Sequence, residues 1–232
     1  MTQKIKNLFL YHRYKIAVFG LMLFSSLVCV TLVAARIEYT ATTSQIGLVW
    51  NLFLAWIPFV LSYLAYALSW KKWLLYFALP FTAFLWLIFF PNAPYILTDL
   101  QHLARGATTA PLWYDVIVMV WFSWTGLLLG LVSLYLMHNI VHRTFGRLLG
   151  WVFVFIVSGL SSFGVYLGRF VRFNSWDLFN DPKDVAVTIL GLVIDPSMRV
   201  IAFTILFAVF YLFVYLTLYS FANLVQEQPY AK

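Results

Sequence analysis

The sequence predicts an all-α fold, a six-helix transmembrane bundle with short interfacial helices on the extracytoplasmic side. Of its 232 residues, 63% are hydrophobic and 10% are charged, whereas soluble domains carry about 25% charged residues. The mean hydropathy is +0.89. Six uncharged apolar runs each approach the roughly 20 residues that cross a bilayer. A water-soluble globular protein and a disordered chain are therefore excluded.

The six predicted spans form a single domain over residues 1–232. Each run is continuously apolar, which argues against barrel strands, where apolar and polar residues alternate. The first run follows a basic segment, as in a signal peptide, but it exceeds the usual length of about 7–15 residues and is interpreted as a retained helix. The predicted bounds are 16–35, 47–69, 73–90, 116–137, 148–168 and 200–222.

The basic residues predict the orientation of these spans. With the N-terminus inside, nine Lys and Arg residues lie inside and six outside, whereas seven of the eight acidic residues lie outside. Because Lys and Arg favour cytoplasmic loops, both termini are expected on the cytoplasmic side of a bacterial inner membrane. The formal charge of +7 would then face anionic lipids of the bilayer. No nucleic-acid partner is expected, since no basic stripe lies on a soluble element.

Glycines spaced four residues apart mark close helix contacts. Packing within one bundle is the expected role of these pairs, and a homodimer interface is the alternative. The pairs are Gly126 with Gly130, Gly146 with Gly150, and Gly164 with Gly168.

Two further helices are predicted outside the spans. The first covers 92–105, where Pro91 ends the third span and Asn92 suits the N-cap position. On a helical wheel Leu97 and Leu100 share an apolar face, so this helix is expected to lie in the outer interface with that face buried. The second covers about 181–195 and is interpreted as interfacial or re-entrant. The polar face of the predicted 92–105 helix carries Thr98, Asp99, Gln101, His102 and Arg105.

Polar residues from four chain segments are predicted at the outer boundary. Unpaired charges are costly near hydrocarbon, so six of them are expected to approach one cavity, with an Asp in salt-bridge reach of Arg169 or Arg172. These six are Asp99, His102, Asp115, Arg169, Arg172 and Asp177. The full set of candidate ligand-binding residues adds Asn51, Asn92, Tyr114, Tyr166, Asn174 and Trp176.

The chemistry of this set leaves alternatives open. Arg forks match phosphate geometry, so Arg169 and Arg172 are candidates for holding an anionic head group, with pairing to a nearby Asp as the alternative. A metal or acid–base role for Asp99, His102 and Asp115 is less favoured than an interfacial helix showing its polar side. No metal or cofactor is therefore predicted. His138 and His142 are interpreted as a solvated helix end.

Several runs resemble a family of bacterial polytopic membrane proteins known only as a domain of unknown function. They are Phe90-Pro91-Asn92-Ala93-Pro94-Tyr95, Leu112-Trp113-Tyr114-Asp115, and the segments 51–58 and 164–177. The resemblance extends from about the second span to the sixth. It implies a bacterial multi-pass membrane protein of about this length, and it implies no catalytic residues.

Three functions remain open at this stage. The preferred one is an outer-face site for a lipid or an anionic head group. A transporter, or the substrate-binding membrane subunit of one, is the second, and a structural or accessory scaffold is the third. Ion coupling is disfavoured, because the predicted spans hold no charge near the midplane. Whether a reaction is catalysed is left open.

Overall fold

A computed structural model describes residues 2–69, 72–105 and 110–224, all of them without strands. Within these residues, six helical segments are long and apolar enough to cross a membrane. The predicted all-α, six-helix fold is therefore confirmed. The elements are α1 (Thr2–Thr40), α2 (Ile46–Leu68), α3 (Lys72–Phe89), α4 (Asn92–Tyr95), the 3₁₀ helix η1 (Ile96–Arg105), α5 (Leu112–Phe145), α6 (Arg147–Tyr166), the π turn η2 (Leu167–Val171), α7 (Asp177–Asn180), α8 (Pro182–Ile194) and α9 (Met198–Leu224).

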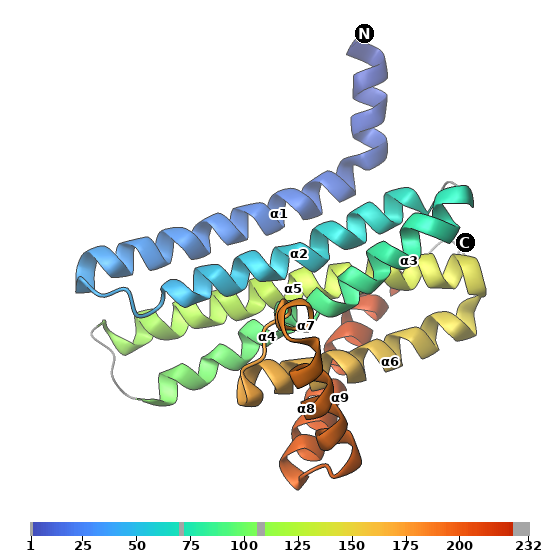
Figure 1. The fold of residues 1–232 in the computed structure, drawn as a ribbon. Coiled ribbons are helices and arrows are strands. Elements are labelled where there is room, and N and C mark those ends of the chain that lie inside the picture. Colours follow the sequence, from blue (N-terminus) through green and yellow to red (C-terminus); the bar gives the residue numbers. More distant parts are fainter. Residues whose placement is uncertain (1, 70–71, 106–109, 225–232) are drawn as a thin grey trace.

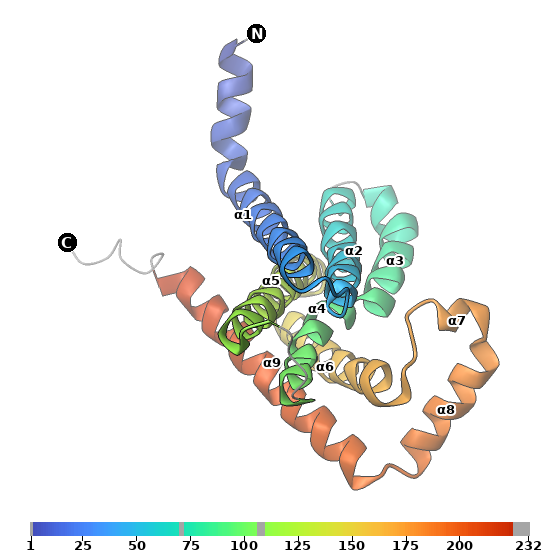
Figure 2. The same cartoon turned by 90° about the vertical axis from the view of Figure 1, so that its left-hand side faces the viewer.

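Helix α5 is the central element of the bundle. It packs against α1, α2, α4, η1 and α6, and α9 packs on α6. The long helices α2, α5 and α6 and most of α1 run in roughly the same direction along the bundle, whereas the N-terminal part of α1 bends away (Figure 1). Figure 2 looks along α2 and α5 and shows α9 from its side, so α9 crosses the bundle obliquely.

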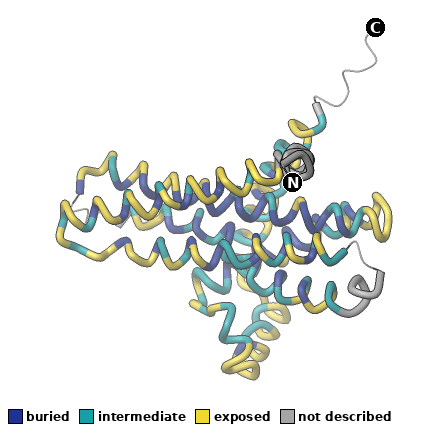
Figure 3. Tube along the Cα trace, turned by 90° about the horizontal axis from the view of Figure 1, so that it is seen from above, coloured by how far each residue is buried: buried dark blue, intermediate teal, exposed yellow. Residues whose placement is uncertain are grey.

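The surface of the bundle is apolar around most of its circumference. Exposed and buried residues alternate along the long helices (Figure 3), and the buried ones include Phe59, Phe122 and Leu134. Outward-facing Phe24 and Phe213 are each more than 60% exposed. Apolar surface on this scale fits hydrocarbon rather than water as the surroundings.

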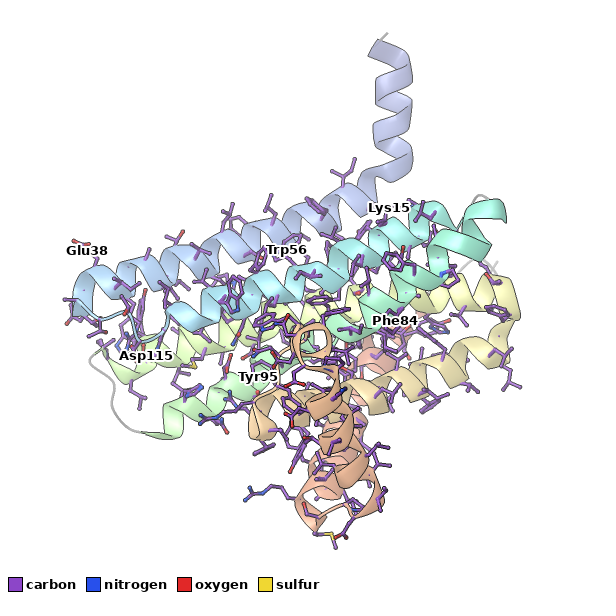
Figure 4. All side chains as sticks on the ribbon, viewed as in Figure 1. Lys15, Glu38, Trp56, Phe84, Tyr95 and Asp115 are labelled. Atoms are coloured by element: carbon purple, nitrogen blue, oxygen red, sulfur yellow. The ribbon has the colours of Figure 1, made fainter. Side chains whose placement is uncertain are left out.

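The third segment is broken in the middle of the bundle rather than at its predicted outer boundary. Tyr95, at the end of the break, lies between Phe84 and Asp115 along the bundle (Figure 4). After the break the chain continues as η1 towards the Asp115 end, and the candidate third span is Ala78–Leu103. As predicted, the long helix α3 ends next to Pro91, at Phe89, and the short helices α4 and η1 carry the candidate span further, to Leu103.

Two of the predicted glycine pairs explain how the break is held. A Cβ atom added at Gly126 would lie 2.8 Å from the carbonyl oxygen of Ala93, and one at Gly130 would lie 3.1 Å from the Ala93 Cβ. On the other side, a Cβ at Gly164 would lie 2.6 Å from Pro91 Cγ, and one at Gly168 would lie 3.2 Å from the Tyr95 ring. Glycines from α5 and α6–η2 thus cradle α4, which confirms their packing role within the chain. A homodimer stays an untested prediction.

The remaining elements include one confirmation and one correction. Asp181 caps α8 by accepting a hydrogen bond from the Asp184 amide at 3.3 Å, as the predicted helix over 181–195 requires. His138, by contrast, is only 2% exposed, and its Nδ1 lies 2.7 Å from the Tyr215 hydroxyl. The prediction of a solvated helix end was wrong for His138, because α9 crosses over this part of α5.

Candidate functional site

Two buried ion pairs join elements of the bundle just outside the predicted spans. The first joins α1 to α5: Arg36 Nε lies 2.7 Å from Asp115 Oδ1 and Nη2 lies 3.2 Å from Oδ2. Asp115 is completely buried and Arg36 is 3% exposed. Gln45, just before α2, donates its amide to Asp115 Oδ1 at 2.9 Å. Asp115 thus pairs with a cation from α1 and not with Arg169 or Arg172.

The rest of the Arg36 guanidinium is also occupied. Nη1 donates to Ser44 Oγ at 3.0 Å and to Thr42 Oγ1 at 3.3 Å. Gln45 Oε1 is buried and has no hydrogen-bond partner among the described residues. At this end of the bundle the Gln45 side-chain oxygen is therefore an unused acceptor, whereas every nitrogen of the Arg36 guanidinium donates a hydrogen bond.

The second ion pair joins η1 to η2. Arg169 Nη1 lies 3.0 Å from Asp99 Oδ1, which confirms the predicted Asp within salt-bridge reach of Arg169. Asn51 donates to Asp99 Oδ2 at 2.8 Å, and His102 Nε2 lies 3.7 Å from Oδ1. Three chain segments therefore meet at one carboxylate.

All three nitrogens of the Arg169 guanidinium donate hydrogen bonds, as those of Arg36 do. Nη2 donates to the Thr98 carbonyl at 2.6 Å, and Nη1 also donates to the Tyr95 hydroxyl at 3.2 Å. With its amide oxygen turned to the guanidinium, Gln101 accepts from Nε and Nη2. The charge is held over the Tyr95 ring, 5.5 Å from its centroid.

The 3₁₀ geometry of η1 explains why Asp99 is buried. With three residues per turn, Ile96, Asp99 and His102 align on one side. Ile96 is fully buried and Asp99 is 4% exposed, whereas Leu97 and Leu100 are half-buried. The predicted division between an apolar and a polar face was therefore wrong at Asp99, whose burial is stabilised by Arg169 and Asn51. The Arg105 side chain lies outside the described residues.

A polar cavity of about 260 Å³ lies between the two ion pairs. Asp99, His102 and Asp115 line it, so three of the six residues predicted to converge share one cavity. Its other polar lining residues are Arg36, Ser44, Gln45 and Asn51.

A second and larger space is a groove of about 490 Å³. It is bounded by α2, α3–α4, α6–η2 and α8. Most of its lining is apolar, as at Leu87, Phe163 and Ile189, and its described lining residues include no charged side chain. Asn51 lines both the groove and the polar cavity. The other polar lining residues are Asn92, Tyr95, Asn174 and Ser175.

Asn92 connects two sides of this groove. Its side-chain amide donates to the Phe89 carbonyl at 3.0 Å and to Ser175 Oγ at 2.8 Å. The Asn92 side chain therefore pairs with a carbonyl group at the end of α3 and links it to the segment before α7. The N-cap residue of α4 is Pro91. The predicted capping role was wrong.

Arg172 and Asp177 do not line the polar cavity. The π turn leaves Arg172 exposed in a left-handed conformation with φ 69°, so Arg169 and Arg172 do not share a side. Asp177 accepts the Asn174 backbone amide at 2.7 Å and shapes a local turn.

Three aromatic candidates have structural contacts. Tyr114 donates to the Leu32 carbonyl at 2.7 Å, and Tyr166 is buried with its ring 4.9 Å from that of Phe170. The Trp176 ring lies 6.2 Å from that of Trp50, which lines the groove.

Sequence reasoning missed Arg36, Gln45 and Tyr95 as members of the site. An arginine at the end of an apolar run is a signal that a buried partner is needed, but the sequence does not name the partner. Among the described residues, no three His, Cys, Asp or Glu side chains are grouped so that they could hold a metal ion.

Comparison with known proteins gives a family match, and the matched region contains most of the candidate site. No curated protein and no solved structure matches the chain. A family profile described as "Protein of unknown function (DUF1361)" matches residues 50–217. That region includes the groove, Asn51 and the Asp99–Arg169 pair, and excludes Arg36 and Gln45. Because the match covers well over half of the chain, the protein belongs to the DUF1361 family.

Proposed function

We propose that this protein binds a lipid-like amphiphile in the groove between α2, α3–α4, α6–η2 and α8. The observation that carries the proposal is the lining of that groove. Apolar side chains cover most of it, and amides and hydroxyls gather around Asn51, Asn92 and Asn174. Sites for small ligands commonly combine an apolar wall with a few convergent polar groups. A chain on the apolar wall and a polar head near Asn51 would use both parts.

Filling the groove is expected to release the ligand. Ile189 lines the groove from α8, whereas its neighbour Leu190 is 58% exposed and does not line it. Ile189→Trp should lower lipid retention roughly tenfold, or about 1.4 kcal/mol, and Leu190→Trp should leave it unchanged. Native mass spectrometry of the purified protein measures the retained lipid. Equal retention by both variants would contradict the proposal.

A carrier function is the second candidate, and the mid-bundle break favours it. Transporters often bind substrate at helices that are discontinuous near the bilayer midplane, and non-helical backbone at that depth is tolerated where it lines a cavity. Pro91, Asn92 and Tyr95 line the groove. Movement of a fluorescent lipid between leaflets of proteoliposomes distinguishes the two functions, because binding alone leaves the rate unchanged. A scaffold would leave both retention and movement unaffected by groove variants.

We also propose that both termini face the cytoplasm of a bacterial cell. Lys15 and Arg143 lie 4.8 Å and 4.9 Å from the Tyr66 ring, whereas Glu38 and Asp115 lie at the other end of the bundle (Figure 4). This charge separation follows the usual preference of basic residues for the cytoplasm.

Cysteine labelling in intact cells tests this orientation. Cys29 is buried and is replaced by serine as the background. In that background, exposed Thr43→Cys should react with an impermeant maleimide, and exposed Thr144→Cys should react only after lysis. The reverse pattern would invert the proposed orientation.

A further inference from the structure

We infer that the amphiphile has an uncharged head group bearing hydroxyls and lacks a phosphate. This inference deepens the proposed function and rests on it. It changes the preferred ligand class from the anionic head group that the two arginines of the sequence predict. The basis is the hydrogen-bonding capacity of the groove and of the polar cavity that meets it at Asn51.

The groove offers a phosphate no cation. Its described polar lining consists of amides and hydroxyls, at Asn51, Asn92, Tyr95, Asn174 and Ser175. Placing an anion in an apolar surrounding without a countercharge is strongly unfavourable. Amides and hydroxyls, in contrast, pair readily with neutral hydroxyl groups.

The two buried arginines cannot supply the missing charge. Arg169 holds Asp99 at 3.0 Å and the Thr98 carbonyl at 2.6 Å, and its remaining nitrogen faces Gln101. Arg36 holds Asp115 through two nitrogens and Ser44 through the third. A phosphate could bind either fork only by displacing a buried carboxylate, which would leave that carboxylate unpaired.

The polar cavity holds one buried acceptor without a partner among the described residues, Gln45 Oε1. The carboxylates of Asp99 and Asp115, which already accept hydrogen bonds from Asn51, Arg169, Arg36 and Gln45, line the same cavity. Acceptors of this kind attract hydroxyl donors and repel a phosphate. A hydroxyl-bearing head group beside Asn51 could therefore donate hydrogen bonds to acceptors of the polar cavity, while its apolar chain lies in the groove.

Arg172 is the competing cation. It is exposed at the end of η2, directly before two groove-lining residues, Phe173 and Asn174. If a phosphate bound at the mouth of the groove, Arg172 would be the residue to hold it. The experiment therefore includes this residue.

Photolabelling with two matched lipids tests the inference. One probe is a monoglucosyl diacylglycerol and the other a phosphatidic acid, both carrying the same diazirine acyl chains, presented to the purified full-length protein in detergent. Mass spectrometry then quantifies labelling of the groove peptides from α6 and α8. The neutral probe is expected to label them at least about tenfold more, in the wild type and in Arg172→Gln. Asn174→Arg adds a cation at the exposed rim of the groove. This variant should lower the ratio of labelling by the neutral probe to labelling by phosphatidic acid.

The outcomes distinguish the inference of a neutral head group from the proposed binding of an amphiphile in the groove. Equal or stronger groove labelling by phosphatidic acid overturns the neutral-head inference and leaves the proposed function standing, above all if Arg172→Gln abolishes it. If neither probe labels the groove above the level in Ile189→Trp, the proposed function itself fails.

Discussion

Asp115→Leu is expected to lower the free energy of unfolding by about 3–5 kcal/mol, because it leaves a buried arginine without a countercharge. Arg36 is 3% exposed, and its hydrogen-bond partners other than Asp115 are two neutral hydroxyls, of Ser44 at 3.0 Å and Thr42 at 3.3 Å. Neither replaces the charge of the carboxylate 2.7 Å away. Scanning fluorimetry in detergent measures the loss as a lower melting temperature.

A double-mutant cycle separates the ion pair from simple loss of packing. Arg36→Met with Asp115→Leu should be more stable than Asp115→Leu alone, since an apolar pair in a buried site often replaces an ion pair at little cost. Asp177→Asn is the control, because Asp177 serves an exposed local turn. Additive losses in the double variant would show that the two side chains are not coupled.

The helices were predictable because hydropathy and capping are local properties of a sequence. Each of the six apolar runs became a helix, and the Asp181 cap placed α8 within a residue of its predicted start. The helix ends were less predictable. Charges at Arg36 and Asp115 mark the end of a span only if they face water, and here they face each other.

The partners within the site were not predictable, because they are set by tertiary structure. Arg36 and Asp115 are 79 residues apart, and Asp99 and Arg169 are 70 residues apart. The sequence predicts that buried charges need partners, but it offers several candidates for each. Arg172 shows the opposite error: a continuous helix would place it beside Arg169, and the π turn of η2 rotates it to the surface.

The location of the break depended on the same long-range packing. A proline after an apolar run is typical of a helix end, so the Pro91 segment was expected at the boundary of the membrane. In the structure the glycines of α5 and α6 leave room for Pro91 and Ala93 beside their backbones. The glycine spacing predicted close contacts correctly, but it did not show that the segment filling them is the one predicted as a helix over 92–105.

Gly126→Ala and Gly164→Ala are each expected to lower the free energy of unfolding by about 1–3 kcal/mol, the usual range for overpacking. The added Cβ would lie 2.8 Å from the Ala93 carbonyl oxygen at Gly126 and 2.6 Å from Pro91 Cγ at Gly164. Neither obstacle is the end of a flexible side chain, so α4 itself has to move. Thermal unfolding in detergent measures the effect.

Gly159→Ala is the matched control on α6. Nothing lies within 4 Å of a Cβ at this position, and alanine is favoured over glycine in a helix by roughly 0.5–1 kcal/mol. The control should therefore be neutral or slightly more stable. Tyr95 is the last residue of α4, lines the groove and accepts a hydrogen bond from Arg169. A shifted α4 should therefore also reduce lipid retention in Gly126→Ala and Gly164→Ala, while Gly159→Ala keeps it. If all three variants melt together, α4 does not fill the space between these two helices, and the groove loses the wall on which the proposed site depends.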